Sequence, residues 1–223
     1  MKKLIRLSLL AFLLSSVFLL VGCNKSAQPP LPESKPSETA TPEKTPSDPP
    51  AKEVVPAATP GDFFPVVANS TWEYQGEGNE YATFNRKIVF TGDNLAQIRE
   101  DNGGTVSASV FKISSDAVTR IFFIGEAYEQ KNHLKSPSNQ NLIILKAPLK
   151  VGTKWNEPNG TREIVDLNAT VATPAGTFAQ CLKVKITNDN STLYEYFKSG
   201  IGMVKREFIS GDSKVTSSLK NHT

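Results

Sequence analysis

The chain has 223 residues, and its two Cys and two His residues exclude a disulfide framework within one domain and the common metal-binding spacings. The formal net charge of +3 comes entirely from Lys2, Lys3 and Arg6, because from Cys23 onward 22 Lys and Arg balance 22 Asp and Glu. A formally neutral chain needs no basic face, so we expect no nucleic-acid partner, and we expect no metal ion or cofactor.

The first 22 residues have the composition of a secretory signal peptide. A basic head, residues 1–6, precedes an apolar stretch, residues 7–22. The stretch falls short of the roughly 20 apolar residues that span a bilayer. We therefore expect a cleaved leader rather than a retained transmembrane helix.

The apolar stretch ends at Leu20-Val21-Gly22-Cys23, which resembles the lipobox of bacterial lipoproteins. The resemblance covers about the first 23 residues. It implies a thioether between diacylglycerol and Cys23, with cleavage just before this cysteine. Two or more acyl chains hold a protein stably on a bilayer, at about 0.8 kcal/mol per buried CH₂. The resemblance thus implies a lipid-anchored protein on the extracytoplasmic face of the cell membrane, or in the outer membrane of a Gram-negative host because Asn24 is not Asp.

Residues 24–60 have the composition of a tether. They contain ten prolines, eight Ser or Thr and no aromatic residue. Such a segment buries too little apolar surface to offset the entropy of ordering, and proline favours extended polyproline II geometry. We expect residues 23–60 to form a lipidated cysteine followed by a disordered linker.

Residues 61–223 are predicted to form an all-β globular domain, because apolar residues alternate with polar ones between turn signals. Short links favour antiparallel neighbours. We expect a single antiparallel, curved meander sheet, or a partly open barrel or sandwich. The predicted strands are residues 71–75, 81–91, 94–100, 105–113, 117–125, 142–146, 161–173, 179–187, 192–199, 203–210 and 213–220.

One connection, residues 126–141, is much longer than the others, and we expect it to hold a helical turn. Connections of this length are often functional or mobile.

Two segments echo each other, since Trp72 follows Pro65 and Trp155 follows Pro148, each by seven residues. Two explanations remain open. The domain contains a weak internal repeat, 61–146 and 147–223, or each Pro simply turns the chain into a strand whose Trp fills one end of the core.

Two predicted strands are apolar on both faces, because residues 121–124 and 142–145 do not alternate. The second face needs a cover. The cover is protein, such as the 126–141 connection or a curled sheet, or an apolar ligand such as an acyl chain, or a partner surface. The residues that would face a ligand are Phe122, Phe123, Ile143, Ile144, Trp72 and Trp155.

No catalytic motif is found, since G-x-S-x-G and the P-loop pattern are absent. Cys181 shares a predicted strand face with Lys183 and Lys185, which could lower its thiol pKa, but a packed, unreactive thiol is the simpler interpretation. Three pairs of carboxylates fall at or near predicted turns, where solvated acids are ordinary. These pairs are Glu77 and Glu80, Glu100 and Asp101, and Glu126 and Glu129.

The sequence therefore predicts a non-catalytic lipoprotein that binds an apolar or amphiphilic ligand of the cell envelope. The first alternative is a scaffold lipoprotein that binds another envelope protein. The second is a glycan-directed hydrolase, which needs two carboxylates about 5–10 Å apart in one cleft. The oligomeric state is not indicated by the sequence.

Overall fold

The computed structural model describes residues 57–158 and 160–223, and all of them lie in the unit Glu53–Thr223. The predicted signal peptide, the lipobox with Cys23, and the tether up to residue 56 lie outside the described residues.

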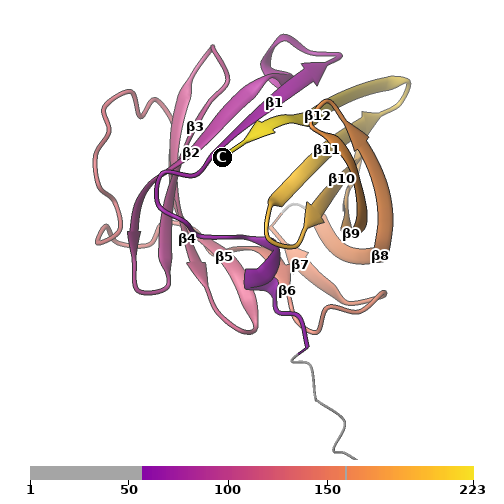
Figure 1. The fold of residues 1–223 in the computed structure, drawn as a ribbon, viewed down its shortest axis with the longest axis horizontal. Helices are drawn as coiled ribbons and strands as arrows, with labels where there is room; N and C mark the ends of the chain where they lie inside the picture. Colours follow the sequence, from indigo (N-terminus) through magenta and orange to yellow (C-terminus); the bar gives the residue numbers. More distant parts are fainter. Residues whose placement is uncertain (1–56, 159) are drawn as a thin grey trace, which may run out of the picture. The chain divides into compact units, whose positions relative to one another are not determined.

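Twelve antiparallel strands form one sheet in the described unit, and the sheet curls into a nearly closed, barrel-like shape (Figure 1). Each strand pairs with its neighbours in sequence, except that β6 and β7 do not pair with each other, and β1 also pairs with β12. The strands are β1 (Thr71–Glu77), β2 (Phe84–Gly92), β3 (Leu95–Asp101), β4 (Val106–Ile113), β5 (Ala117–Ile124), β6 (Leu142–Lys146), β7 (Lys154–Glu157), β8 (Gly160–Thr173), β9 (Gly176–Asn188), β10 (Ser191–Lys198), β11 (Gly202–Ser210) and β12 (Ser213–His222).

The predicted all-β meander is confirmed, and eleven of the twelve strands match a predicted range. The alternation of apolar and polar residues accounts for this agreement. On β9, Leu182, Val184 and Ile186 are buried inside the sheet, whereas Lys183 and Lys185 lie on the other face. The tight β3–β4 turn follows from its sequence, because the Asn102 side chain accepts hydrogen bonds from the backbone of the next residues.

The strand β7 was not predicted as a separate element. It has only four residues, and Trp155 is its one apolar side chain. β7 and β6 are the two edges of the sheet, and we call the line where they approach each other the seam. Trp155 Nε1 donates a hydrogen bond of 2.9 Å to the Ile143 carbonyl oxygen across this seam.

Register shifts interrupt several strand pairs and give the sheet its curvature. The long pair β8–β9 contains three of them, and the pair β2–β3 contains one between Ile88 and Phe90. The sheet therefore bends around an interior that receives side chains from most of its strands.

A short 3-10 helix, η1 (Pro60–Phe63), links the two sides of the sheet at one end, and a second, η2 (Glu80–Ala82), lies between β1 and β2. The Asp62 carbonyl oxygen accepts a hydrogen bond of 2.8 Å from Gly200 N, in the β10–β11 turn. The Phe64 ring lies 4.8 Å from the Phe111 ring of β4, on the opposite side. From η1 the chain runs across the opening of the sheet to β1 (Figure 1).

The 126–141 connection lies against the outer face of β3 to β5. Its His133 ring stacks on Phe122 at 4.7 Å between centroids. The buried Gln97 side chain accepts from His133 N and donates to the Lys131 carbonyl oxygen. The connection contains no helical turn, which corrects the prediction, because side-chain hydrogen bonds satisfy its backbone instead of a local i to i+4 ladder.

Candidate functional site

The inner face of the sheet carries ionised side chains among its apolar residues. Strand pairing brings them together: Arg86 lies opposite Glu100 on β2 and β3, and Glu195 lies opposite Arg206 on β10 and β11. We call the complete set the inner charge cluster. It consists of Arg86, Glu100, Arg120, Glu157, Arg162, Glu195 and Arg206.

Glu195 is the centre of one group of ion pairs. Its Oε2 accepts a hydrogen bond of 2.9 Å from Arg162 Nη1, and its Oε1 lies 3.4 Å from Arg206 Nε. Arg162 also binds the Glu157 carboxylate. Burial alone would raise the pKa of Glu195, but Arg162 and Arg206 hold this pKa below its ordinary value. Glu195 is therefore ionised at neutral pH although only 5 % of it is exposed.

Arg86 and Glu100 form a second ion pair, with 2.6 Å between Nε and Oε2. Burial would raise the pKa of Glu100, yet Arg86 and Arg206 keep this pKa below its ordinary value. Tyr74 lies beside Arg86, and burial raises the Tyr74 pKa to about 12, so the phenol stays neutral.

Arg120 has different surroundings from the other three arginines. Its Nε donates a hydrogen bond of 2.8 Å to Gln140 Oε1, and its guanidinium carbon lies 4.8 Å from the centre of the Phe123 ring. Among the described residues, no carboxylate lies within ion-pair distance of Arg120. The inner charge cluster thus has four guanidinium groups and three carboxylates, which leaves one surplus positive charge.

All of the cluster except Glu100 and Glu157 lines a cavity of about 370 Å³ inside the sheet, which we call the inner cavity. Aromatic and aliphatic side chains form most of its remaining wall. These are Phe64, Phe111, Leu142, Ile144, Leu193, Phe197, Met203 and Phe208.

A second hollow adjoins the inner cavity and shares Arg120, Leu142, Arg162 and Leu193 with it. This seam groove has a volume of about 590 Å³ and is lined from both β6 and β7, so it lies over the seam. It also contains the polar side chains of residues 139–141. The inner cavity, which is apolar and partly charged, is therefore continuous with the polar rim of the seam groove.

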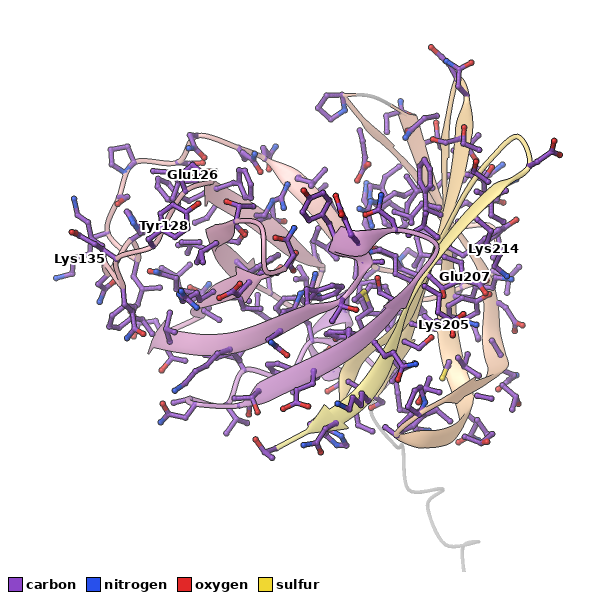
Figure 2. The ribbon with its side chains drawn as sticks, turned by 90° about the horizontal axis from the view of Figure 1, so that it is seen from above. Glu126, Tyr128, Lys135, Lys205, Glu207 and Lys214 are labelled. Carbon is purple, nitrogen blue, oxygen red and sulfur yellow. The ribbon has the colours of Figure 1, made fainter. Side chains whose placement is uncertain are left out.

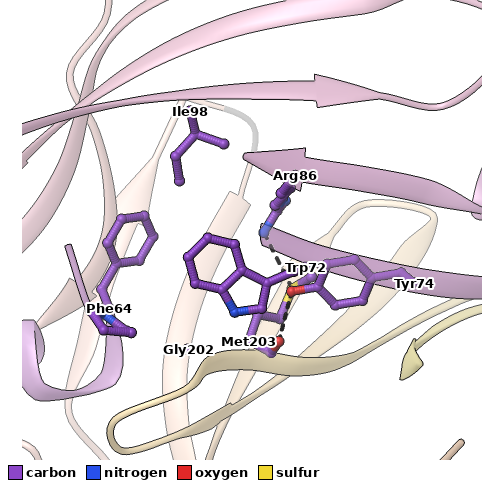
Figure 3. Close-up of a pocket in the computed structure, with 8 residues that line it drawn as sticks. Phe64, Trp72, Tyr74, Arg86, Ile98, Gly202 and Met203 are labelled. Atoms are coloured by element: carbon purple, nitrogen blue, oxygen red, sulfur yellow. Dashed lines mark hydrogen bonds between the residues drawn. The ribbon is translucent and has the colours of Figure 1, made fainter. Parts of the chain in front are cut away.

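A third space, next to Trp72, is too small for a ligand (Figure 3). Its volume of about 20 Å³ is that of one water molecule. Trp72 Nε1 donates to the Ile201 carbonyl oxygen and Tyr74 Oη donates to the Met203 carbonyl oxygen, so both rings are fixed. Phe64, Arg86 and Met203 form the wall between this space and the inner cavity.

The six apolar residues predicted to face a ligand are not brought together. Only Ile144 lines the inner cavity. Phe123 lies beside Arg120, whereas Phe122 lies on the outer face under His133 of the 126–141 connection. Ile143 packs against the core. Trp155 is buried at the seam, and Trp72 lines the small third space.

Cys181 is fully buried in the hydrophobic core and forms no disulfide. Burial raises the pKa of its thiol, and the nearby Lys198 opposes this effect only in part. Lys183 and Lys185 therefore do not govern this thiol, and its burial agrees with the simpler interpretation of a packed, unreactive thiol.

In two of the three carboxylate pairs noted in the sequence, other groups engage a carboxylate. Glu100 faces the interior, whereas Asp101 pairs with Arg99. Glu126 accepts hydrogen bonds from Tyr128 and Thr105 at the surface. Figure 2 shows Glu126, Tyr128 and Lys135 on one side of the unit, and on the other side Glu207 between Lys205 and Lys214.

Sequence reasoning missed the inner charge cluster, although a signal was present. Arg86 lies between Phe84 and Ile88, and Glu195 between Leu193 and Phe197, at positions where period-two alternation places an apolar residue. A charge at such a position indicates an interior that contains partners for it.

Within residues 57–158 and 160–223, no helix is both long and apolar enough to cross a membrane. The same residues contain no group of three or more His, Cys, Asp or Glu side chains arranged to hold a metal ion.

No family model and no curated protein matches the chain. Two solved structures are similar to it in fold. One, from Bacteroides fragilis NCTC 9343, is provisionally described as an exported protein with a YmcC-like fold; it is 14% identical, with a TM-score of 0.45 over 71% of this chain and 97% of the other. The second, from Parabacteroides distasonis ATCC 8503, is provisionally described as a lipoprotein; it is 15% identical, with a TM-score of 0.42 over 72% of this chain and 98% of the other.

Proposed function

We propose that this chain is a bacterial lipoprotein, held at the extracytoplasmic face of the cell membrane through acylated Cys23, whose all-β domain binds an amphiphilic ligand of the envelope. The sequence Leu20-Val21-Gly22-Cys23 supports the anchor. The proposal includes no catalytic step, because the carboxylates of the inner charge cluster are engaged by arginines.

The observation that carries the binding role is the inner cavity. Its volume of about 370 Å³ falls within the usual range of about 300–1,000 Å³ for small-molecule sites. Its wall combines eight apolar side chains with five charged ones, which suits a molecule with an apolar chain and a polar head.

Native mass spectrometry tests the binding role. The chain from residue 23 with Cys23→Ser, which lacks the acylation site, is secreted by its own host behind an ordinary cleavable leader, purified from outside the cytoplasmic membrane and measured without detergent. We expect an additional mass that disappears on denaturation. A bare polypeptide mass from several growth conditions would count against a ligand.

A variant pair locates that ligand. Leu193→Phe adds volume at a residue shared by the inner cavity and the seam groove, and it should reduce the bound fraction. Val151→Phe, at a position that is 63% exposed, is the matched control and should not change it.

Metabolic labelling tests the anchor. Radioactive palmitate should label the wild-type chain and not the Cys23→Ser variant, and only the wild type should partition with membranes. Equal labelling of both chains would show that Cys23 is not the acylated residue.

The scaffold alternative is favoured by one surface feature. Tyr81, Ile124 and Tyr128 are 54%, 42% and 58% exposed, and contacts through Gly104, Thr105 and Glu126 connect the two tyrosines at one end of the sheet. A partner captured by crosslinking in cells and lost in a Tyr81→Ser, Tyr128→Ser variant would support this function.

A further inference from the structure

The inner cavity contains more positive than negative charge, and the surplus falls on two arginines. Arg86 and Arg162 each bind a carboxylate with good geometry. Arg120 forms no ion pair in the described part of the chain, and Arg206 shares Glu195 with Arg162. Arg120 and Arg206 therefore have donors that the protein leaves unused.

Arg206 Nε provides the clearest sign of an unused donor. This atom is buried and forms no hydrogen bond with any described residue. Its distance of 3.4 Å from Glu195 Oε1 exceeds the roughly 2.7–2.9 Å of a charge-assisted hydrogen bond. An unpaired buried donor on a cation is costly, so it indicates a partner that completes the site.

Two neighbouring side chains fix the orientation of the Arg120 guanidinium. Phe123 covers one face and Gln140 fixes Nε, which orients the remaining N–H groups. Arg120 lines both the inner cavity and the seam groove, so a ligand that enters over the seam would meet it. Burial lowers the pKa of Arg120, Glu100 opposes this effect, and the nearby Arg86, Arg162 and Arg206 add to the lowering.

We propose that Arg120 and Arg206 bind the anionic head group of the ligand, a carboxylate or a phosphate, while its apolar chain lies against Leu142, Ile144 and Leu193. This inference rests on the function proposed above and specifies the chemical class of the ligand. The planar guanidinium fork matches carboxylate and phosphate oxygens and can bind both in a bidentate manner.

The apolar wall selects against a small free anion as the intended ligand. Aromatic and aliphatic side chains surround the arginines on most sides, and an inorganic ion would leave that surface facing water. A molecule with an anionic head and an alkyl chain satisfies both parts of the wall.

Isothermal titration calorimetry with probes of equal chain length tests the inference. The processed chain with Cys23→Ser, freed of endogenous ligand, is titrated with laurate, dodecyl phosphate and 1-dodecanol below their aggregation concentrations. We expect at least one of the two anions to bind ten times or more tightly than the alcohol, and the tighter anion identifies the head group.

Substitution then assigns the preference to a residue. Arg120→Gln keeps a hydrogen-bonding side chain but removes the charge, and should weaken binding of the preferred anion at least tenfold without changing dodecanol binding. The matched control is Arg99→Gln, which removes a guanidinium from the outer face of β3, where Asp101 is its ion-pair partner. This control should leave all three affinities unchanged.

Arg120→Lys keeps the proposal testable if Arg120→Gln does not fold, as judged by circular dichroism. Lysine retains the charge but not the planar fork, so the anion preference should fall between those of the wild type and dodecanol. Equal affinity for anion and alcohol, or an unaltered preference in Arg120→Lys and Arg120→Gln, would overturn the inference while leaving the proposed function intact. Absence of binding by all three probes would overturn both.

Discussion

At the scale of single residues, Glu195 decides the charge balance of the interior. Its carboxylate forms an ion pair with Arg162 and a second, longer ion pair with Arg206. All three groups lie inside the sheet. A buried carboxylate with two cationic neighbours cannot be removed without leaving uncompensated charge.

Glu195→Gln should destabilise the domain by about 3–5 kcal/mol, the usual cost of breaking a buried ion pair from one side. Urea denaturation followed by tryptophan fluorescence measures this change in the free energy of unfolding. The matched control is Glu163→Gln, because Glu163 pairs at 3.3 Å with Lys154, whose side chain is largely exposed. Its cost should stay below about 1 kcal/mol. Equal effects of the two substitutions would contradict the central role of Glu195.

The stability of the domain should fall in acid. The pKa values of Glu100 and Glu195 are lowered in the folded protein, whereas the pKa of a glutamate carboxyl in an unfolded chain is about 4.3. The unfolded state therefore binds more protons below that pH, so the stabilisation is complete above it and is lost as the pH falls through the folded pKa values.

Urea midpoints measured between pH 7 and pH 3 check this sign. We expect a nearly constant midpoint near neutrality and a decline below about pH 5. The decline should be shallower in Glu195→Gln than in Glu163→Gln. A midpoint that rises in acid would be incompatible with ion-paired interior carboxylates.

At the scale of elements, strand positions were predictable because each strand needs only its own alternation. For β5, which is apolar on both faces, the sequence left three explanations for what covers the second face: protein, a ligand or a partner. The structure shows protein over Phe122, namely His133 of the 126–141 connection. The connection is held by Gln97, a polar residue on the outer face of β3. The alternation within one strand cannot predict that a distant segment of the chain will bury such a residue.

Gln97→Ala should release this connection from the sheet. The substitution leaves the Lys131 carbonyl and His133 N without their partner, at a cost of about 1–3 kcal/mol. Amide hydrogen exchange within residues 129–134 should accelerate while exchange in β9 and β10 stays constant. The exposed Gln75 on β1 is the control, and Gln75→Ala should not alter exchange in the connection. Unchanged exchange in Gln97→Ala would mean that other contacts hold it.

At the scale of the whole domain, the sheet consists of two successive six-stranded meanders, β1 to β6 and β7 to β12. They are joined by the β1–β12 pair and meet again at the seam. Trp72 and Trp155 lie on the first strand of each meander, and each donates its indole N–H to a backbone carbonyl. This arrangement agrees with the echo in the sequence, and an origin by duplication stays a hypothesis.

Trp155→Phe should loosen the seam. It keeps an aromatic ring but removes the hydrogen bond to the Ile143 carbonyl, so we expect a loss of about 1 kcal/mol and faster hydrogen exchange in β6. Trp72→Phe is matched in chemistry and should accelerate exchange near Ile201 rather than in β6. Identical exchange patterns in both variants would show that Trp155 has no special role at the seam.

The sequence predicted a curved sheet or a partly open barrel, but not which residues line the cavity, because the lining depends on how strands far apart along the chain curve toward each other. The register shifts within β8–β9 and the meeting of β6 with β7 place Arg120, Arg162 and Glu195 around one space. Each of these residues alone reads as an ordinary charge on a strand.

Phe64 gives the domain a mechanical property. It directly follows η1, its ring packs at a tilt against the Phe111 ring, and it forms part of the wall of the inner cavity. If Cys23 carries the proposed anchor, tension applied through it reaches Phe64 before it reaches any strand. Such a load would act first on the wall of the inner cavity, and retention of the proposed ligand would depend on force.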